Sequence, residues 1–173
     1  MKIIDRQSRG FTLLELLVVM TIAALLAGGG LHGWIGYQQA LHLEQGAQQL
    51  LDFLLRVQSR AYWLNENQQV RLIQQGEHWC MDSGSGAERD ARACFEENGC
   101  CEDNGRQFVR ASKALSIAES TADAFFFYGL RNAAQAGHIT LTNAAGRVRL
   151  VISVRGRMRL CSEARQVLAI PLC

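Results

Sequence analysis

The sequence predicts an α+β protein in which a long N-terminal helix packs on an antiparallel β-sheet domain with disulfides. Helical periodicity extends from the N-terminal region to residue 64, short alternating β-like runs follow residue 65, and all six cysteines lie in the C-terminal part. A chain of 173 residues can form one domain with its own core and an appendage. The formal net charge of +2 excludes a global attraction to nucleic acid, so only local charge is informative.

The appendage begins with an apolar segment over residues 11–27, FTLLELLVVMTIAALLA. As a helix it would span about 25 Å, near the lower limit for crossing a bilayer. Lys2, Arg6 and Arg9 precede it against Asp5 alone, which predicts a cytoplasmic N-terminus and an exported C-terminal part. We therefore expect a single membrane-spanning or filament-core helix over residues 11–36.

Glu15 interrupts this apolar segment and needs a partner. A carboxylate at mid-helix in lipid costs about 2.5–3.5 kcal/mol on the lenient insertion scale, and such residues are usually functional. A secretory signal peptide would instead have an uninterrupted apolar core and a small-x-small cleavage site after it. The alternative is a single-span membrane anchor in which Glu15 has no function. Cleavage between Gly10 and Phe11 would create a cationic amine four residues before Glu15, within reach in the same helix or a neighbouring one.

The sequence from Arg9 to Glu15, RGFTLLE, followed by an apolar run, resembles the class III signal of type IV prepilins and pseudopilins. This resemblance implies that prepilin peptidase removes residues 1–10 as a leader, that the amine of Phe11 is methylated, and that Glu15 aligns incoming subunits. The implied partners are prepilin peptidase, other pilin or pseudopilin subunits and the inner membrane. The C-terminal domain would then be periplasmic and would assemble into a filament.

Residues 37–64 have the period of an amphipathic helix continuous with the first segment. Two apolar series repeat every seven residues: Ala40, Ala47, Leu54 and Ala61, and Leu43, Leu50, Val57 and Leu64. Leu51 and Leu55 widen this stripe, as expected for a helix that packs on a sheet. We expect the helix to bend or melt at the glycine triplet 28–30 when a subunit leaves lipid for a filament, because each glycine costs up to about 1 kcal/mol relative to alanine in a helix. A simple break where the helix leaves the membrane is the alternative.

Residues 65–173 are expected to form the antiparallel β domain. Its first strands are predicted at 69–73 and 78–81, with a turn over 74–77, and an acidic, cysteine-rich surface loop over 82–105. A calcium loop is the alternative for this segment, but the regular ligand spacing is missing. The C-x-x-C spacing of a zinc site is also missing, so we predict no metal site. The disulfide candidates are Cys80, Cys94, Cys100, Cys101, Cys161 and Cys173, and we expect Cys161 to pair with Cys173 because this bond would tie down the C-terminus.

The C-terminal third predicts two hairpins. Alternation places Val148, Leu150, Ile152 and Val154 on the core face, and Met158 and Leu160 are expected to join them. A three-residue loop over 155–157, with Gly156 in the left-handed conformation, would give this register. The fragments FYGLRN, AGHI and GRMRLC, at 127–132, 136–139 and 156–161, resemble the C-terminal module of GspH/FimT-type minor pilins. The resemblance implies a low-abundance subunit that primes or caps a type IV pilus or a type II secretion pseudopilus.

No enzyme is indicated, because the full G-x-S-x-G pattern is missing and the four histidines are scattered without the carboxylate spacing of a catalytic site; no catalytic residue or cofactor is predicted. The alternative function is DNA binding. No acidic residue occurs over 124–162, where guanidinium groups could bind phosphate. The proposed DNA-binding residues are Arg147, Arg149, Arg155, Arg157 and Arg159. A solvated basic face, or one that meets the acidic cysteine loop of a neighbouring subunit, is the favoured explanation, and no aromatic residue is interleaved within residues 147–159 to support base stacking.

Overall fold

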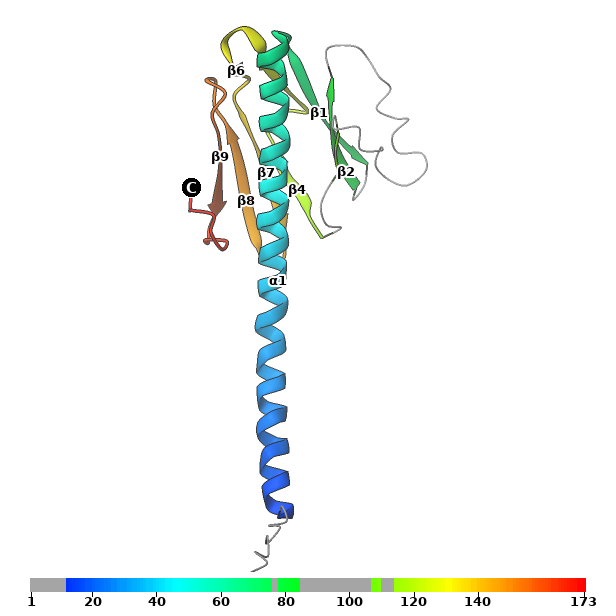
Figure 1. Cartoon of the computed structure of the whole chain (residues 1–173), viewed down its shortest axis with the longest axis vertical. Helices are drawn as coiled ribbons and strands as arrows, with labels where there is room; N and C mark the ends of the chain where they lie inside the picture. The colour runs from blue at the N-terminus through cyan, green and yellow to red at the C-terminus, as the bar shows by residue number, and fades with distance from the viewer. Residues whose placement is uncertain (1–11, 76–77, 85–106, 110–113) are drawn as a thin grey trace, which may run out of the picture. The chain divides into compact units, whose positions relative to one another are not determined.

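The computed structural model describes residues 12–75, 78–84, 107–109 and 114–173. It divides the chain into two units, residues 1–36 and residues 37–173. The predicted leader and most of the cysteine-rich loop lie outside the described residues. The α+β fold is confirmed: one helix packs on two antiparallel sheets within the second unit, an arrangement consistent with a type IV pilin fold (Figure 1).

The one α-helix among the described residues, α1, covers Leu13–Leu64. It ends in a Schellman motif: Asn65 has a φ of 55°, its N–H donates to the carbonyl of Tyr62, and the N–H of Glu66 donates to that of Ala61. Asparagine tolerates this left-handed position better than most residues, which explains why the helix ends here. α1 is continuous through the glycine triplet at 28–30, so the break considered there is absent, whereas bending on transfer into a filament stays a prediction.

The part of α1 in the second unit carries the expected buried stripe. Leu43, Ala47, Leu50, Leu54, Val57 and Ala61 are all buried. Two predictions at the margins are wrong: Leu55 is exposed rather than widening the stripe, and Leu64 is exposed because the helix ends at that residue. Phe53 is buried as well and packs against Phe108, with ring centroids 5.7 Å apart.

The first sheet has five strands in the order β3-β2-β1-β5-β6. The strands are β1 Gln68–Gln75, β2 His78–Gly84, β3 Gln107–Val109, β5 Ala124–Tyr128 and β6 Ala133–Ala134. The predicted pairing of the first two strands is confirmed, but both are longer than expected. Gln74 and Gln75 pair with Trp79 and His78, so the turn is tighter than the predicted 74–77, and residues 82–84 extend β2 where a loop was expected.

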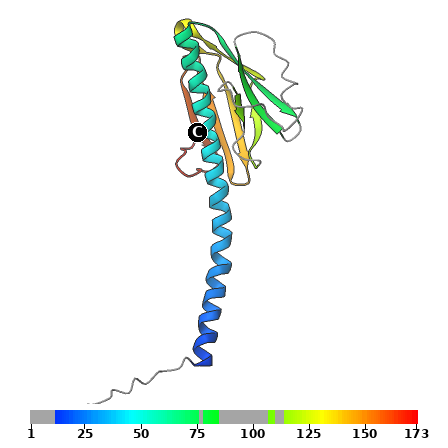
Figure 2. The ribbon, with the colours of Figure 1, turned by 45° about the vertical axis from the view of Figure 1, so that its right-hand side comes forward.

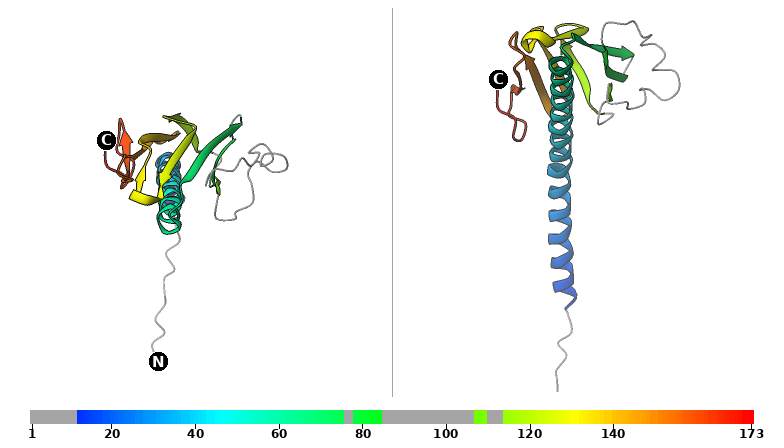
Figure 3. Two further views of the ribbon diagram at one scale, coloured as in Figure 1. Left: turned by 90° about the horizontal axis from the view of Figure 1, so that it is seen from above. Right: turned by 45° about the horizontal axis from the view of Figure 1, so that its top comes forward.

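The second sheet has four strands in the order β4-β7-β8-β9. The strands are β4 Ser116–Ser120, β7 Gly137–Asn143, β8 Gly146–Ile152 and β9 Met158–Glu163. A 3₁₀ turn, η2 Gly129–Arg131, connects β5 to β6. Figures 2 and 3 show how the strands of both sheets curve around the part of α1 that belongs to this unit.

The predicted register of the last hairpin is confirmed, since Leu150 pairs with Leu160 and Ile152 pairs with Met158. Val154 was expected on the core face, but 66% of it is exposed. The connection is also longer than three residues, because β8 ends at Ile152 and β9 begins at Met158. Ser153 ends the strand: its side-chain oxygen accepts from the N–H of Arg157, and its carbonyl accepts from the N–H of Gly156.

Helix and sheets share one core. The apolar stripe of α1, Phe125 and Phe127 from the first sheet, and Val148 and Leu150 from the second all belong to it. Trp79 lies within this core and satisfies its indole N–H with the carbonyl of Leu115, at 2.9 Å. The second unit therefore fixes the positions of its surface side chains on a packed scaffold.

Candidate functional site

Glu15 lies in the first turn of α1. Thr12 caps this end of the helix, because its side-chain oxygen accepts from the N–H of Glu15 at 3.3 Å and its carbonyl accepts from the N–H of Leu16. Threonine followed three residues later by glutamate is a helix-start pattern that the sequence analysis overlooked. Gly10 and Phe11, the predicted processing residues, lie outside the described residues. A cleaved amine at Phe11 would directly precede the capping residue of the helix.

The described side chains around Glu15 form an apolar surface that is exposed to solvent. The large exposed apolar residues of this segment are Leu13, Leu14, Leu16, Leu17, Val18, Val19, Met20, Ile22, Leu25, Leu26, Trp34 and Ile35. So much contiguous apolar surface on one helix marks a site of contact with lipid or with another protein. In the described part of the chain, no helix reaches the length and mean hydropathy that a membrane crossing requires.

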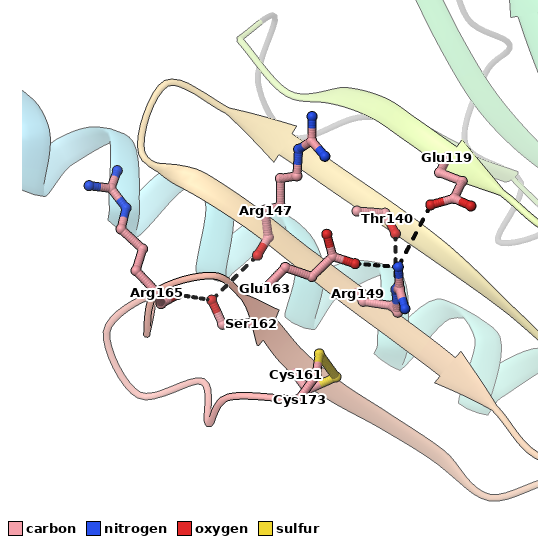
Figure 4. The surroundings of a disulfide bond; sticks show 9 residues. All are labelled: Glu119, Thr140, Arg147, Arg149, Cys161, Ser162, Glu163, Arg165 and Cys173. Carbon is pink, nitrogen blue, oxygen red and sulfur yellow. Dashed lines mark hydrogen bonds and ion pairs between the residues drawn. A yellow bond between two sulfur atoms is a disulfide. The ribbon is translucent and has the colours of Figure 1, made fainter.

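The C-terminal disulfide is present as expected, between Cys161 on β9 and Cys173 (Figure 4). The backbone of the tail also pairs with β9: the N–H of Ser162 donates to the carbonyl of Pro171, and the N–H of Cys173 donates to that of Ser162. Cys80 is buried on β2. The other disulfide candidates, Cys94, Cys100 and Cys101, lie outside the described residues.

Arg149 is the centre of a charged network on the outer face of the second sheet (Figure 4). Its Nη2 lies 2.5 Å from Oε1 of Glu163 and 3.7 Å from Oε2 of Glu119, and its Nε donates to the Thr140 hydroxyl at 3.4 Å. His138 extends the network, with Nε2 3.5 Å from Oε1 of Glu119. Arg149 therefore already has two carboxylate partners within its own domain.

The other arginines of the predicted DNA-binding group are exposed: Arg147, Arg155, Arg157 and Arg159. Among the described residues, none of these four forms an ion pair with an acidic side chain. They do not form one cluster. Arg147 lies near the start of β8, whereas Arg155 and Arg157 lie beyond its end, about 20 Å away at roughly 3.3 Å per residue. The structure thus divides the expected basic surface into two ends separated by a neutralised centre.

Sequence reasoning missed the acids because Glu119 and Glu163 flank the acid-free window of residues 124–162. Strand pairing brings both to Arg149: Thr140 pairs with Glu119 on one side and with Arg149 on the other, and β9 places Glu163 diagonally across from Arg149. In the described part of the chain, no group of three or more His, Cys, Asp or Glu side chains could hold a metal ion. The acidic segment that raised the calcium alternative lies mostly outside the described residues.

Comparison with known proteins gives one match. Residues 5–31 match the family model of the prokaryotic N-terminal methylation motif. No curated protein and no solved structure matches the chain significantly. The matched segment contains Gly10, Phe11 and Glu15, and it ends within α1. The motif indicates a type IV pilin-like prepilin, and it implies processing by prepilin peptidase and assembly with other pilins.

Proposed function

We propose that this chain is a non-catalytic minor pilin or pseudopilin of the GspH/FimT type that primes or caps assembly of a type IV pilus or a type II secretion pseudopilus. The match of residues 5–31 to the N-terminal methylation motif carries this proposal. The α+β domain that follows α1, with its oxidised C-terminal cysteine pair, supports it. A disulfide is expected in an oxidising compartment such as the periplasm.

In this proposal, prepilin peptidase cleaves after Gly10, and the amine of Phe11 becomes the methylated N-terminus. Thr12 then caps the helix, and Glu15 presents its carboxylate one turn from the new amine. In a filament, the amine of an incoming subunit pairs with Glu15 of its neighbour. The charge pair sets the axial register, because neither ion is stable alone in an apolar environment.

The exposed apolar surface of α1 supplies the driving force for membrane association and assembly. Burial of one large apolar side chain is worth about 1.5–3 kcal/mol. Twelve such side chains are exposed between Leu13 and Ile35, so their burial outweighs the cost of about 2.5–3.5 kcal/mol for Glu15 in lipid. Lys2, Arg6 and Arg9 keep the N-terminus cytoplasmic, and the second unit is placed in the periplasm.

Two measurements test the proposal. Intact-mass analysis of the membrane-extracted chain should give a mature form that begins at methylated Phe11. Glu15→Ala should be inserted and processed normally but should be lost from filaments, because the amine of the neighbouring subunit loses its partner. Glu44→Ala is the matched control, since it removes an acid from the same helix in the second unit. A mature form that starts near Gly28, or unchanged incorporation of Glu15→Ala, would refute the proposal.

DNA binding is the second candidate function, supported by the four exposed arginines without an acidic partner among the described residues. If these residues bind phosphates, the full-length chain should retard duplexes of any sequence, and binding should weaken steeply as salt rises. Arg157→Ala combined with Arg159→Ala should then flatten the salt dependence. Arg71→Ala, which removes an exposed arginine on β1, should leave the slope unchanged. No retardation at low salt with the chain displayed multivalently would exclude this function.

A further inference from the structure

We infer that the end of the domain at which α1 stops is a docking surface for an acidic subunit other than this chain. Three segments far apart in the sequence meet there: the last turn of α1, η2 and the turn over residues 153–157. We call this end the apical surface. The inference rests on the proposed function, because the partner is taken to be another filament subunit.

Short contacts hold the three segments together. Gln58 on α1 donates from Nε2 to the carbonyl of Gly156 at 3.0 Å and to that of Asn132 at 3.3 Å. Gly129, the first residue of η2, is so close to the end of α1 that a Cβ atom would lie 2.6 Å from the carbonyl oxygen of Ala61. In Figure 1 the turn that contains η2 is seen against the end of the helix. The apical surface is therefore built on rigid elements.

The apical surface exposes large apolar side chains that the core does not use. In this part of the fold they are Tyr62, Trp63, Leu64, Leu130 and Val154. Trp63 and Leu130 are the most exposed, at 79% and 81%. The rings of Tyr62 and Trp63 pack edge to face with centroids 6.0 Å apart, which limits the conformational freedom they would lose on binding. Clustered exposed aromatic and aliphatic side chains are typical of protein–protein contacts.

Exposed arginines lie on the same segments as these apolar side chains. Arg60 lies on the last turns of α1, Arg131 on η2, and Arg155 and Arg157 on the 153–157 turn, and all four are exposed. These segments contain no acidic residue, and Glu66, two residues beyond the end of α1, is the nearest acid in sequence to the helix end. No carboxylate among the described residues forms an ion pair with any of the four arginines. A partner that covers this surface must therefore bring acidic side chains around an apolar centre.

The charge also argues against a second copy of this chain as the partner. A two-fold contact between apical surfaces would place arginine opposite arginine, which is unfavourable by several kcal/mol when the charges are desolvated. A head-to-tail contact between copies is tested directly below, where an adduct of the chain with itself would contradict the inference. Duplex DNA fits less well than protein, because its phosphate backbone offers no apolar surface to cover Leu64, Leu130 and Val154. The exposed rings of Tyr62 and Trp63 would suit a single strand, and the nuclease-sensitive adduct named below tests for it.

Photo-crosslinking of the full-length chain in producing cells tests this inference. Benzoylphenylalanine replaces Leu130, and Leu172, exposed on the C-terminal tail, is the control position. The Leu130 probe should give an adduct with a different polypeptide that carries its own N-terminal methylation motif and an acidic docking face, as identified by mass spectrometry. The Leu172 probe should not give this adduct.

Charge reversal supplies the second readout. Arg131→Glu and Arg157→Glu should each lower the adduct yield by about tenfold or more, because each places a carboxylate against an acidic partner. Arg147→Glu, at the far end of β8, makes the same change in charge and should leave the yield within about twofold. Near-ultraviolet circular dichroism and a thermal midpoint equal to those of the unchanged chain show that each variant is folded.

An adduct with the chain itself, a nuclease-sensitive adduct, an adduct insensitive to Arg131→Glu, or no adduct would each overturn the inference. The mass of the chain in the same samples separates the two proposals. A mature chain that begins at Phe11 and gives no adduct contradicts the apical surface alone. A chain that keeps residues 1–10 contradicts the proposed function, whereas the adduct still tests the surface.

Discussion

Removal of the Cys161–Cys173 bond should destabilise the domain by about 3 kcal/mol. The two cysteines are 12 residues apart, and closing a loop of this length removes about that much conformational entropy from the unfolded chain. The perturbation is Cys161→Ser combined with Cys173→Ser, because a single substitution would leave a thiol able to exchange with the other cysteines. The fold itself brings the two cysteines together, because the N–H of Cys173 also donates to the carbonyl of Ser162, the neighbour of Cys161.

The tail has other anchors, so the loss should be partial. Val167 and Ile170 are buried, and each is worth about 1.5–3 kcal/mol on full burial. The domain should therefore remain folded in the double variant. For a domain of this size, a loss of about 3 kcal/mol corresponds to a fall in midpoint of about 6–12 °C.

Thermal unfolding of the detergent-extracted full chain measures this change. Near-ultraviolet circular dichroism reports on packed aromatic side chains such as Trp79, which is buried in the core, and therefore follows the tertiary structure of the domain. Leu172→Ser is the matched control: it alters an exposed neighbour of the bond and should shift the midpoint by no more than about 1–2 °C. If the double serine variant unfolds within that range too, the entropic argument for this bond is wrong.

Two further stability predictions use the same assay. Arg149→Ala should lower the free energy of unfolding by about 1–3 kcal/mol, because Oε1 of Glu163 is shielded from solvent and would lose the guanidinium 2.5 Å away. The control Arg147→Ala should change it by no more than about 0.5 kcal/mol. Equal losses in the two variants would show that the network does not stabilise the domain. Gly156→Ala should lower the free energy of unfolding by about 1–3 kcal/mol, because φ is +72° and a Cβ atom would lie 2.3 Å from the carbonyl oxygen of Asn132. In the control Gly84→Ala, the added Cβ atom meets nothing within 4 Å. An unchanged thermal midpoint for Gly156→Ala would contradict this prediction.

Features with a strong local period were predictable from the sequence. The stripe of α1 at Ala47, Leu50, Leu54 and Ala61 is buried as the helical period requires. The alternation around Leu150 fixed which face of β8 meets the core, since a slip of one residue would have buried the arginines. These patterns are local consequences of burying one face of an element, so a single sequence contains them.

Features that depend on where an element ends were not predictable in the same way. The alternation around Leu150 continues in sequence to Val154, yet β8 ends at Ile152 because Ser153 bonds to the backbone of the turn. The glycine triplet at 28–30 suggested a break, but α1 continues through it. At the triplet, a preference of up to about 1 kcal/mol per glycine was weaker than the hydrogen bonding of the helix around it. At Ser153 the reverse holds, because the local hydrogen bonds of the turn ended the strand.

Distance along the sequence did not indicate which arginines have acidic partners in the fold. The window over 124–162 contains no acid, and all its arginines therefore looked equivalent. Strand pairing separates them: Arg149 meets Glu119 and Glu163, while Arg155 and Arg157 lie on a turn beyond the reach of either acid. The basic charge available to a partner is consequently concentrated beside the end of α1, where Trp63 and Leu130 are exposed. Arginine together with exposed aromatic and aliphatic side chains favours an acidic protein surface over a bare phosphate backbone, and this ranks subunit docking ahead of DNA binding for the C-terminal domain.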